Sequence, residues 1–282
     1  MIEITPELAE IIGIYVGDGY LRYEGRRKEL DISGSYEEKV YYDNHVIPLF
    51  NQEFNLSIKG RFFPSRRTYG FVIRDRFVIN KFKEFGFPSG KKSLSVTIPQ
   101  FILSSKNSEV KSRFIRGLFD TDGCLSFINR SGYKTYSEFK RTYNYYPTIT
   151  INSISKKLII SLIKLLEDFD FTYHTAKYTY KEKNWNTKYT IFLSGIFNLS
   201  NWIDKINIKN PVKMSRYLVW KKFGFCPTNI DYNQRINILK GKLNPYLFYK
   251  GVYSLMDKTS SFGSQKKLEV LGSNPSRPFL EN

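Results

Sequence analysis

Two nine-residue stretches of the chain repeat each other and decide how the rest of the sequence is interpreted. The first reads IIGIYVGDG from Ile11 to Gly19, and the second reads IRGLFDTDG from Ile115 to Gly123. They align without gaps at an offset of 104 residues, which is 122 minus 18. A segment that recurs in this way is typical of a fold built from related halves.

The segments that follow each copy occur in the same order. β-prone pairs alternate with amphipathic helices, so each half is predicted to run α-β-β-α-β-β-α, which makes the fold class α+β with two pseudo-symmetric repeats. In the first half we expect a helix at 36–54 and strands at 20–24, 28–33, 58–63 and 69–73. In the second half we expect a helix at 156–169 and strands at 124–128, 148–153, 172–181 and 188–193.

The repeat also predicts the domain boundaries. The first repeat covers residues 1–108 and the second covers 109–225, followed by a C-terminal extension at 226–282. No third copy of the motif is visible in this extension. From Lys258 onward Ser, Gly, Pro and Lys dominate, so we expect its end to be a mobile tail.

Each repeated stretch is predicted to end a helix. Thr5-Pro6-Glu7 is a helix start, with Thr as cap and an acid near the positive end of the helix dipole. Gly19 and Gly123 are predicted to end their helices in the left-handed conformation. Asp18 and Asp122 then face the negative ends of the dipoles, where a carboxylate costs a few tenths to about 1 kcal/mol and a lysine is preferred.

Small residues recur four positions apart in each predicted helix. They lie on one face of the helix, and they are Gly13 and Gly17 in the first and Gly117 and Thr121 in the second. Because glycine costs about 1 kcal/mol in a helix interior, we expect these residues to permit close packing of the two helices on each other.

Parallel packing of these helices would bring the two aspartates together. Like charges at short range repel, and a divalent cation between the two carboxylates would offset this repulsion. Mg²⁺ takes a few carboxylates with water and phosphate oxygens, so we predict phosphodiester hydrolysis by metal-activated water at Asp18 and Asp122. The alternative is that each Asp-Gly pair is only a turn, and the matched positions after matched helices favour the metal.

Charge points to a polyanionic partner. Lys and Arg number 44 against 26 Asp and Glu, a net charge of +18, and they are spread from Arg22 to Arg277. Two alternatives would also explain the positive charge: a basic protein from a lysine-rich proteome, or a peripheral membrane protein. No apolar span of membrane length appears in the sequence. The N-terminus lacks a secretion signal, so we expect a cytoplasmic, nucleoid-associated protein or an organellar one, with no membrane partner.

Both stretches resemble the LAGLIDADG motif, and Ile115–Gly123 matches its Gly, Leu, Asp, Asp and Gly positions. The resemblance covers about residues 5–223. It implies a monomeric homing endonuclease, a hydrolase in which the motif helices form the interface and two antiparallel sheets make a DNA-binding saddle. Such a nuclease makes double-strand breaks with short 3′ overhangs in a long, partly palindromic site, using Mg²⁺ with Mn²⁺ able to substitute, and promotes intron or element mobility.

The resemblance also implies residue roles. Asp18 and Asp122 take the catalytic metal-binding positions, while Asp120, whose counterpart is Val16, is structural or supporting. The family places a basic residue near each scissile phosphate, and loops with similar sequences put Lys92 and Lys213 there, with a solvated lysine as the alternative. Two further polar positions of the family's active site fall on a glycine and a serine, Gly34 and Ser153.

The predicted hairpins carry the residues that we expect to contact bases or phosphates in the major groove. They are Arg22, Arg26, Lys28, Arg61, Arg66, Arg67, Arg74, Lys177, Lys181 and Lys188. An RNA maturase that binds intron RNA is the main alternative function. A DNA-binding regulator on the same scaffold is the second, although such a protein should have lost one of the two acids.

Overall fold

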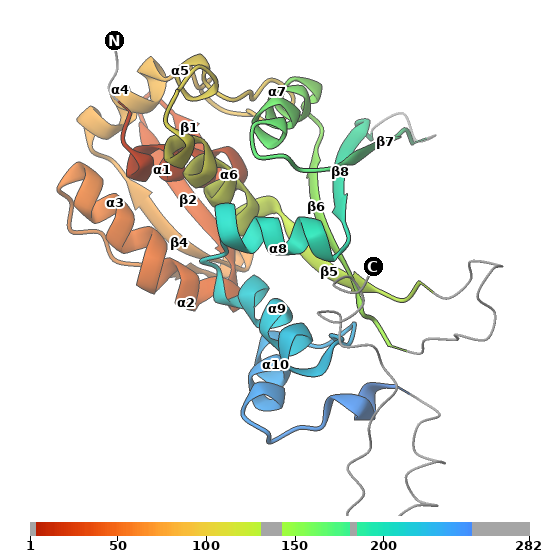
Figure 1. The fold of residues 1–282 in the computed structure, drawn as a ribbon. Helices are drawn as coiled ribbons and strands as arrows, with labels where there is room; N and C mark the ends of the chain where they lie inside the picture. The colour runs from red at the N-terminus through yellow and green to blue at the C-terminus, as the bar shows by residue number, and fades with distance from the viewer. Residues whose placement is uncertain (1–3, 131–142, 181–184, 250–282) are drawn as a thin grey trace, which may run out of the picture. The chain divides into compact units, whose positions relative to one another are not determined.

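The computed structural model describes residues 4–130, 143–180 and 185–249. Lys181, most of the loop at 129–147 and the predicted tail at 258–282 lie outside the described residues. Elements are labelled as in Figure 1.

The first repeat has the predicted order of elements (Figure 1). It contains α1 (Pro6–Asp18), β1 (Gly19–Arg22), β2 (Glu29–Ser35), β3 (Arg61–Phe63), β4 (Thr68–Ile73), α4 (Arg76–Glu84) and the short α5 (Gln100–Leu103). The predicted helix at 36–54 is a continuous run of η1 (Tyr36–Glu38), α2 (Lys39–Tyr41), the π-helical η2 (Tyr42–Val46) and α3 (Ile47–Phe54). A 3₁₀ turn, η3 (Pro64–Arg66), joins β3 to β4.

The second repeat follows the same plan. It contains α6 (Ser108–Asp122), β5 (Cys124–Ile128), β6 (Tyr146–Ser153), α7 (Lys156–Glu167), β7 (His174–Tyr178), β8 (Lys188–Ser194) and α8 (Ile196–Lys205). Beyond it come α9 (Pro211–Phe223), α10 (Tyr232–Leu239) and the 3₁₀ helix η5 (Pro245–Phe248).

Two four-stranded sheets confirm the predicted α+β fold with two pseudo-symmetric repeats. Their strand orders are β1-β2-β4-β3 and β5-β6-β8-β7, so the same element occupies the same place in each. The strand pairs β1–β2, β2–β4, β3–β4 and β7–β8 are antiparallel. Two copies of one topology are what the internal repeat requires.

Contacts between the described residues group the chain into two compact units that cut across the repeats. One unit comprises Met1–Cys124 and Ile149–Lys213, and the other comprises Leu125–Thr148 and Met214–Asn282. Both motif helices belong to the first unit. The predicted boundaries after residues 108 and 225 follow the repeats and stay a prediction.

The start of α1 is as predicted. The Thr5 hydroxyl accepts a hydrogen bond from the Leu8 N–H at 3.0 Å, and Pro6 occupies the first turn. Asn107 does the same for α6, where its side chain accepts from the Glu109 N–H at 2.9 Å.

The prediction that Gly19 and Gly123 are left-handed is wrong. Both have extended backbones, with φ of −85° and −78°. A Cβ atom on Gly19 would lie 2.2 Å from a ring carbon of Tyr15, and one on Gly123 would lie 2.1 Å from a ring carbon of Phe119. Glycine is therefore needed because an aromatic ring one helical turn earlier covers the position, rather than because of a positive φ.

The motif helices α1 and α6 pack directly on each other, side by side in Figure 1. A Cβ atom on Gly13 would lie 2.2 Å from the Phe114 carbonyl oxygen, and one on Gly117 would lie 2.3 Å from the Glu10 carbonyl oxygen. The two contacts are related by the offset of the repeat, because Glu10 and Phe114 are equivalent positions. Any side chain here would force the helix backbones apart.

We expect Gly13→Ala and Gly117→Ala to lower the free energy of unfolding by about 1–3 kcal/mol or more, because the added methyl group meets backbone that cannot rotate away. Helix propensity alone would change stability in the opposite direction by about 1 kcal/mol. Urea unfolding of each variant measures the change. Asn80→Ala, at an exposed position of α4, is the control; a stabilised Gly13→Ala protein would contradict the close approach.

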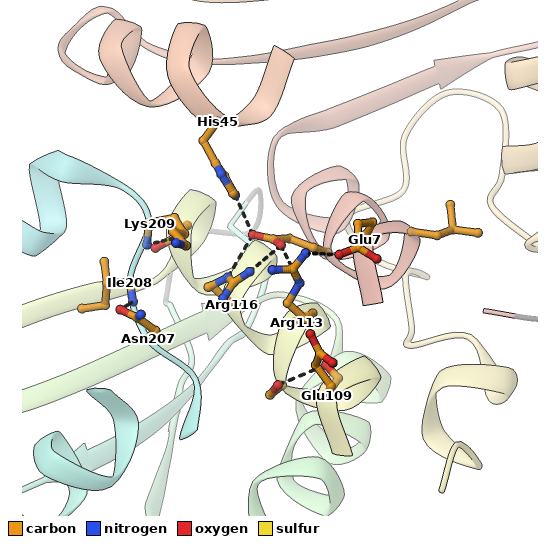
Figure 2. Close-up of polar contacts among 12 residues, drawn as sticks. Glu7, His45, Glu109, Arg113, Arg116, Asn207, Ile208 and Lys209 are labelled. Atoms are coloured by element: carbon orange, nitrogen blue, oxygen red, sulfur yellow. Dashed lines mark hydrogen bonds and ion pairs between the residues drawn. The ribbon is translucent and has the colours of Figure 1, made fainter. Parts of the chain in front are cut away.

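A buried ion-pair network joins the N-terminal halves of these helices. Figure 2 shows His45, Arg113 and Arg116 converging on one carboxylate, which belongs to the fully buried Glu10 of α1. Arg116 donates two hydrogen bonds to it at 2.9 and 2.7 Å, His45 Nε2 lies 2.7 Å away, and Arg113 lies 3.0 Å away and also pairs with Glu7. Burial by itself raises the pKa of Glu10, but the bonds from His45 and Arg116 outweigh it and lower the pKa to about 2.

Glu10→Gln should cost about 3–5 kcal/mol of unfolding free energy at pH 7, because it leaves Arg116 buried without its counter-charge. The folded pKa of Glu10 is depressed, so its stabilisation is complete above the unfolded value of 4.5 and is lost as the pH falls towards 2. Denaturant unfolding at several pH values should therefore show wild type and variant converging at low pH. A difference that persists unchanged below pH 2 would argue against the ion pair as its source.

Candidate metal centre

Asp18 and Asp122 end the two motif helices, and the helix contact brings these ends together. A Cβ atom on Gly17 of α1 would lie 2.1 Å from the Thr121 hydroxyl oxygen and 3.4 Å from Cγ of Asp122. The predicted row of small residues thus lies along the contact as far as the aspartates. Asp18 is half-buried and accepts a hydrogen bond from the Tyr42 hydroxyl at 2.6 Å.

The two carboxyls are held where neither ionises easily. Burial raises the pKa of Asp18 to about 7, and the charges of Asp122 and Glu38 act in the same direction against the Tyr42 hydrogen bond and Lys213. Much of the Asp122 side chain is exposed, yet the surrounding protein still desolvates its carboxyl and raises its pKa, opposed by Lys92 and Lys213. A cation beside these carboxyls would relieve the mutual repulsion.

Lys92, from the segment after α4, and Lys213, from the first turn of α9, reach this region and cap the helix ends. Lys92 Nζ donates to the carbonyl oxygens of Gly17 and Gly19 at the end of α1, the first at 3.1 Å. Lys213 Nζ donates to the carbonyl oxygens of residues 119, 120 and 121 at the end of α6, at 2.6, 2.8 and 2.7 Å. The positive charge that a helix C-terminus favours is therefore supplied by side chains distant in sequence, which offsets the unfavourable aspartates.

Both lysines are almost fully buried, each with 9% exposure. Burial lowers the pKa of both, while neighbouring acids raise it; these are Asp122 and Asp18 for Lys92, and Glu38, Asp120, Asp18 and Asp122 for Lys213. The structure thus excludes the alternative of a solvated lysine for both positions.

Sequence reasoning missed three residues around Asp18. Tyr42 holds its carboxylate, and Glu38 adds a third acid whose pKa is raised by burial. Glu38 accepts a 2.7 Å hydrogen bond from the side chain of Asn210, which also donates to the Asp120 carbonyl oxygen. The one available signal was Ser35-x-x-Glu38, a capping-box pattern, and it indicates only the start of η1.

Gly34 lies against these groups. A Cβ atom there would be 2.7 Å from Oδ2 of Asp18, 2.8 Å from Oε2 of Glu38 and 3.0 Å from the Tyr42 hydroxyl. The glycine makes room for two carboxylates and a phenol where the family resemblance implied a polar side chain. Ser153, the matching position in the second repeat, accepts the Ser155 N–H at 3.0 Å and so serves the turn before α7.

Asp120 is completely buried beside the helix end. Its Oδ2 accepts the backbone N–H of Lys209 at 2.9 Å, and within the described ranges Oδ1 has no hydrogen-bond partner. Burial raises its pKa to about 7, against the opposing charge of Lys213. It holds the loop before α9, which positions Asn210 and Lys213.

Several of the predicted DNA-contacting residues share one face of the first sheet. The strand register places Arg22 opposite Glu29, and Arg61 opposite Gly70, on the face away from the buried Leu30 and its neighbours. Arg74 is exposed and lies 3.5 Å from Glu29. Arg26, Lys28 and Arg67 are exposed in the turns between strands.

Other predicted contacts are not brought together in this way. Arg66 pairs with the carboxylate of Asp31 at 2.7 Å, so this arginine already has a partner. In the second sheet Lys188 pairs with Tyr178, whereas Lys177 pairs with Tyr189 one residue further along, so the two lysines occupy opposite faces. Lys181 is outside the described residues.

The donor set fits a divalent cation held by few protein ligands. In the part of the chain that the structure describes, no group of three or more His, Cys, Asp and Glu side chains is arranged to hold a metal. Asp18 and Asp122 offer hard carboxylate oxygens, as Mg²⁺ and Mn²⁺ require, and leave room for water and phosphate ligands. Among the same residues, none of the helices has the length and apolar character needed to cross a membrane.

Residues 109–207 match the model of the LAGLIDADG-like domain. A curated relative is the isomerizing glutamine–fructose-6-phosphate aminotransferase of Methanocaldococcus jannaschii, 29% identical over 196 residues. The match takes in 67% of this chain but only 15% of that protein's length.

Several solved structures are also similar. I-DmoI in complex with DNA and Mn is 16% identical, with a TM-score of 0.48 over 72% of this chain and 96% of that one. The N-terminal LAGLIDADG domain of DUF199/WhiA is 14% identical, with a TM-score of 0.44 over 72% of this chain and 81% of that one.

A thermal-shift measurement tests the paired carboxylates. The folded pKa of Asp18 is raised, so the folded state keeps a proton that the unfolded state has lost, and stability should fall as the pH rises from 3.8 to about 7. Without metal at pH 8, Asp18→Asn should therefore melt higher than wild type.

Excess MgCl₂ should raise the melting temperature of wild type and have a smaller effect on Asp18→Asn and Asp122→Asn. Asp204→Asn removes an equal charge from an exposed position of α8 and is the control. Equal Mg²⁺ shifts in all four proteins would show that the aspartates do not bind the metal.

Proposed function

We propose that the chain is a LAGLIDADG protein and a metal-dependent DNA endonuclease, which hydrolyses both strands of a long, partly palindromic site and thereby promotes the mobility of an intron or related element. The observation that carries the proposal is the pairing of Asp18 and Asp122 at the ends of two helices in backbone contact, with a buried lysine at each end. Such an arrangement carries an energetic cost in the free protein, which a role in binding and catalysis explains.

Asp18 and Asp122 would hold the divalent cation, Mg²⁺ with Mn²⁺ able to replace it. When bound, the cation polarises the scissile phosphate and lowers the pKa of water. In the hydrolysis, the oxygen of water bonds to phosphorus while the bond from phosphorus to the leaving oxygen breaks, and that oxygen takes a proton.

The chain's own residues prepare this step. The Tyr42 hydroxyl fixes the orientation of the Asp18 carboxylate, and the buried charges of Lys92 and Lys213 add positive potential beside the reacting phosphates. Because these groups are fixed by the fold, little reorganisation is needed when substrate arrives.

The basic surface supports duplex DNA as the partner. The net charge is +18, and Arg22, Arg61 and Arg74 share the face of the first sheet that is turned away from its core. Two repeats within one chain supply two different half-sites, so we propose that a monomer reads a site that is only partly palindromic. This function places the protein with DNA, in the cytoplasm at the nucleoid or in an organelle.

A cleavage assay tests the proposal. Duplexes selected from a randomised library for tight binding in Ca²⁺ are incubated with wild type in Mg²⁺ or EDTA and both strands are followed on denaturing gels. We expect double-strand cutting that requires Mg²⁺ and is lost in Asp18→Asn and Asp122→Asn, with Asp204→Asn as the active control. Since Asp18→Asn should be at least as stable as wild type, its inactivity would not reflect unfolding.

Tight DNA binding without cutting by wild type would overturn the endonuclease and leave a DNA-binding regulator. Failure to bind duplex DNA, together with tight binding of a structured intron RNA, would instead assign the basic surface to a maturase.

A further inference from the structure

The two buried lysines occupy equivalent places, but they do not have equal numbers of hydrogen bonds. An ammonium group has three N–H donors. Those of Lys213 are all engaged by the carbonyl oxygens of residues 119, 120 and 121, at 2.6 to 2.8 Å. Lys213 therefore has no donor left for a phosphate or a water molecule.

Lys92 donates to two carbonyl oxygens only, those of Gly17 and Gly19. Its third N–H has no acceptor among the described residues. The aromatic contacts do not explain the difference, because Lys92 lies 5.3 Å from the Tyr15 ring centroid and Lys213 lies 5.4 Å from that of Phe119. One lysine is thus saturated as a helix cap, while the other keeps a donor free beside the aspartates.

The two aspartates also differ in the hydrogen bonds that they accept. Asp18 accepts a 2.6 Å hydrogen bond from Tyr42, and Glu38 lies beside it with Asn210 bonded to its other oxygen. Asp122, by contrast, accepts no hydrogen bond from the residues that the structure describes, and much of its side chain is exposed. The opposite charge that acts most strongly on it is that of Lys92.

The repeat explains how this difference arises. Aligning Gly34 with Ser153, an offset of 119, places Lys157 opposite Glu38 and Ser161 opposite Tyr42. Lys157 is exposed, and the Ser161 hydroxyl lies 3.2 Å from that of Thr97. The second repeat therefore has no acid at the position of Glu38 and no tyrosine at the position of Tyr42.

We propose that the two halves of the site act unequally: Lys92 and Asp122 contact the phosphate and water of one DNA strand, whereas Lys213 is a positioning residue that holds the end of α6, so that one strand is cut before the other. This inference rests on the proposed endonuclease function. An ammonium group with a free N–H can donate a hydrogen bond to the charge that develops on a phosphate. An ammonium group whose three N–H groups already donate to carbonyl oxygens cannot.

The test compares Lys92→Met with Lys213→Met on the selected duplexes, with each strand labelled separately. Lys91→Met and Lys209→Met remove exposed neighbouring lysines and serve as matched controls. In single-turnover reactions in Mg²⁺, wild type should nick one strand first, and Lys92→Met should slow that nick by about 10²–10³-fold, the loss typical of one donor to a developing charge. Lys213→Met should keep the ratio of the two nicking rates while its melting temperature falls.

A binding measurement keeps the proposal testable without cleavage. In Ca²⁺, the slope of log affinity against log salt should become shallower by about one in Lys92→Met, because one phosphate contact is lost, and should be unchanged in Lys213→Met. If Lys213→Met does not fold, Lys213→Arg retains the charge and should show the wild-type slope and strand ratio.

Equal losses on both strands from either variant, or a strand-selective loss and a changed slope in the Lys213 variants, would overturn the inequality. Wild type that binds but does not cut would remove the endonuclease function, while the salt slopes would still decide whether Lys92 alone contacts phosphate. Wild type that does not bind duplex DNA would overturn both.

Discussion

The backbone contact between α1 and α6 is the constraint on which the rest of the structure depends. Gly13 and Gly117 are the two points where a Cβ atom would collide with the carbonyl oxygen of the opposite helix. Because both helices are in contact over this stretch, the residues that end them, Asp18 and Asp122, are held at a fixed spacing. The chemistry proposed for the site is a consequence of this packing.

Close contact also creates electrostatic demands that the chain meets differently at the two ends of the helix pair. At the N-terminal end, the carboxylate of Glu10 is buried among Arg113, Arg116 and His45, which stabilise its charge. At the C-terminal end, two carboxylates lie at the unfavourable poles of the helix dipoles and repel each other. The side chains of Lys92 and Lys213 bond the carbonyls there and not the carboxylates, which suits a site that takes up a cation with its substrate.

The second consequence is that a symmetric scaffold holds an asymmetric site. The strand orders of the two sheets are the same, and the glycine contacts and lysine caps obey the same approximate symmetry. Tyr42 and Glu38 break it, because Tyr42 donates to Asp18 and Glu38 lies beside it, whereas Asp122 accepts no hydrogen bond from the described residues. In a single chain each repeat can change separately, so the two strands of a duplex need not meet equal chemistry.

Much of this architecture was accessible from the sequence alone. The repeated motif, its offset and the order of the flanking patterns determined two α-β-β-α-β-β-α repeats and two aspartates at helix ends, because those features depend on residues close together in the chain. Local pattern was misleading at Gly19 and Gly123, where an aromatic ring rather than a left-handed backbone requires glycine. Only the tertiary structure decided that Lys92 and Lys213 are buried against carbonyl oxygens at the helix ends, and that Glu38 meets Asn210 across 172 residues. Such contacts join segments that are distant in sequence, and their partners are selected by the path of the folded chain, which no local period of hydrophobicity or charge records.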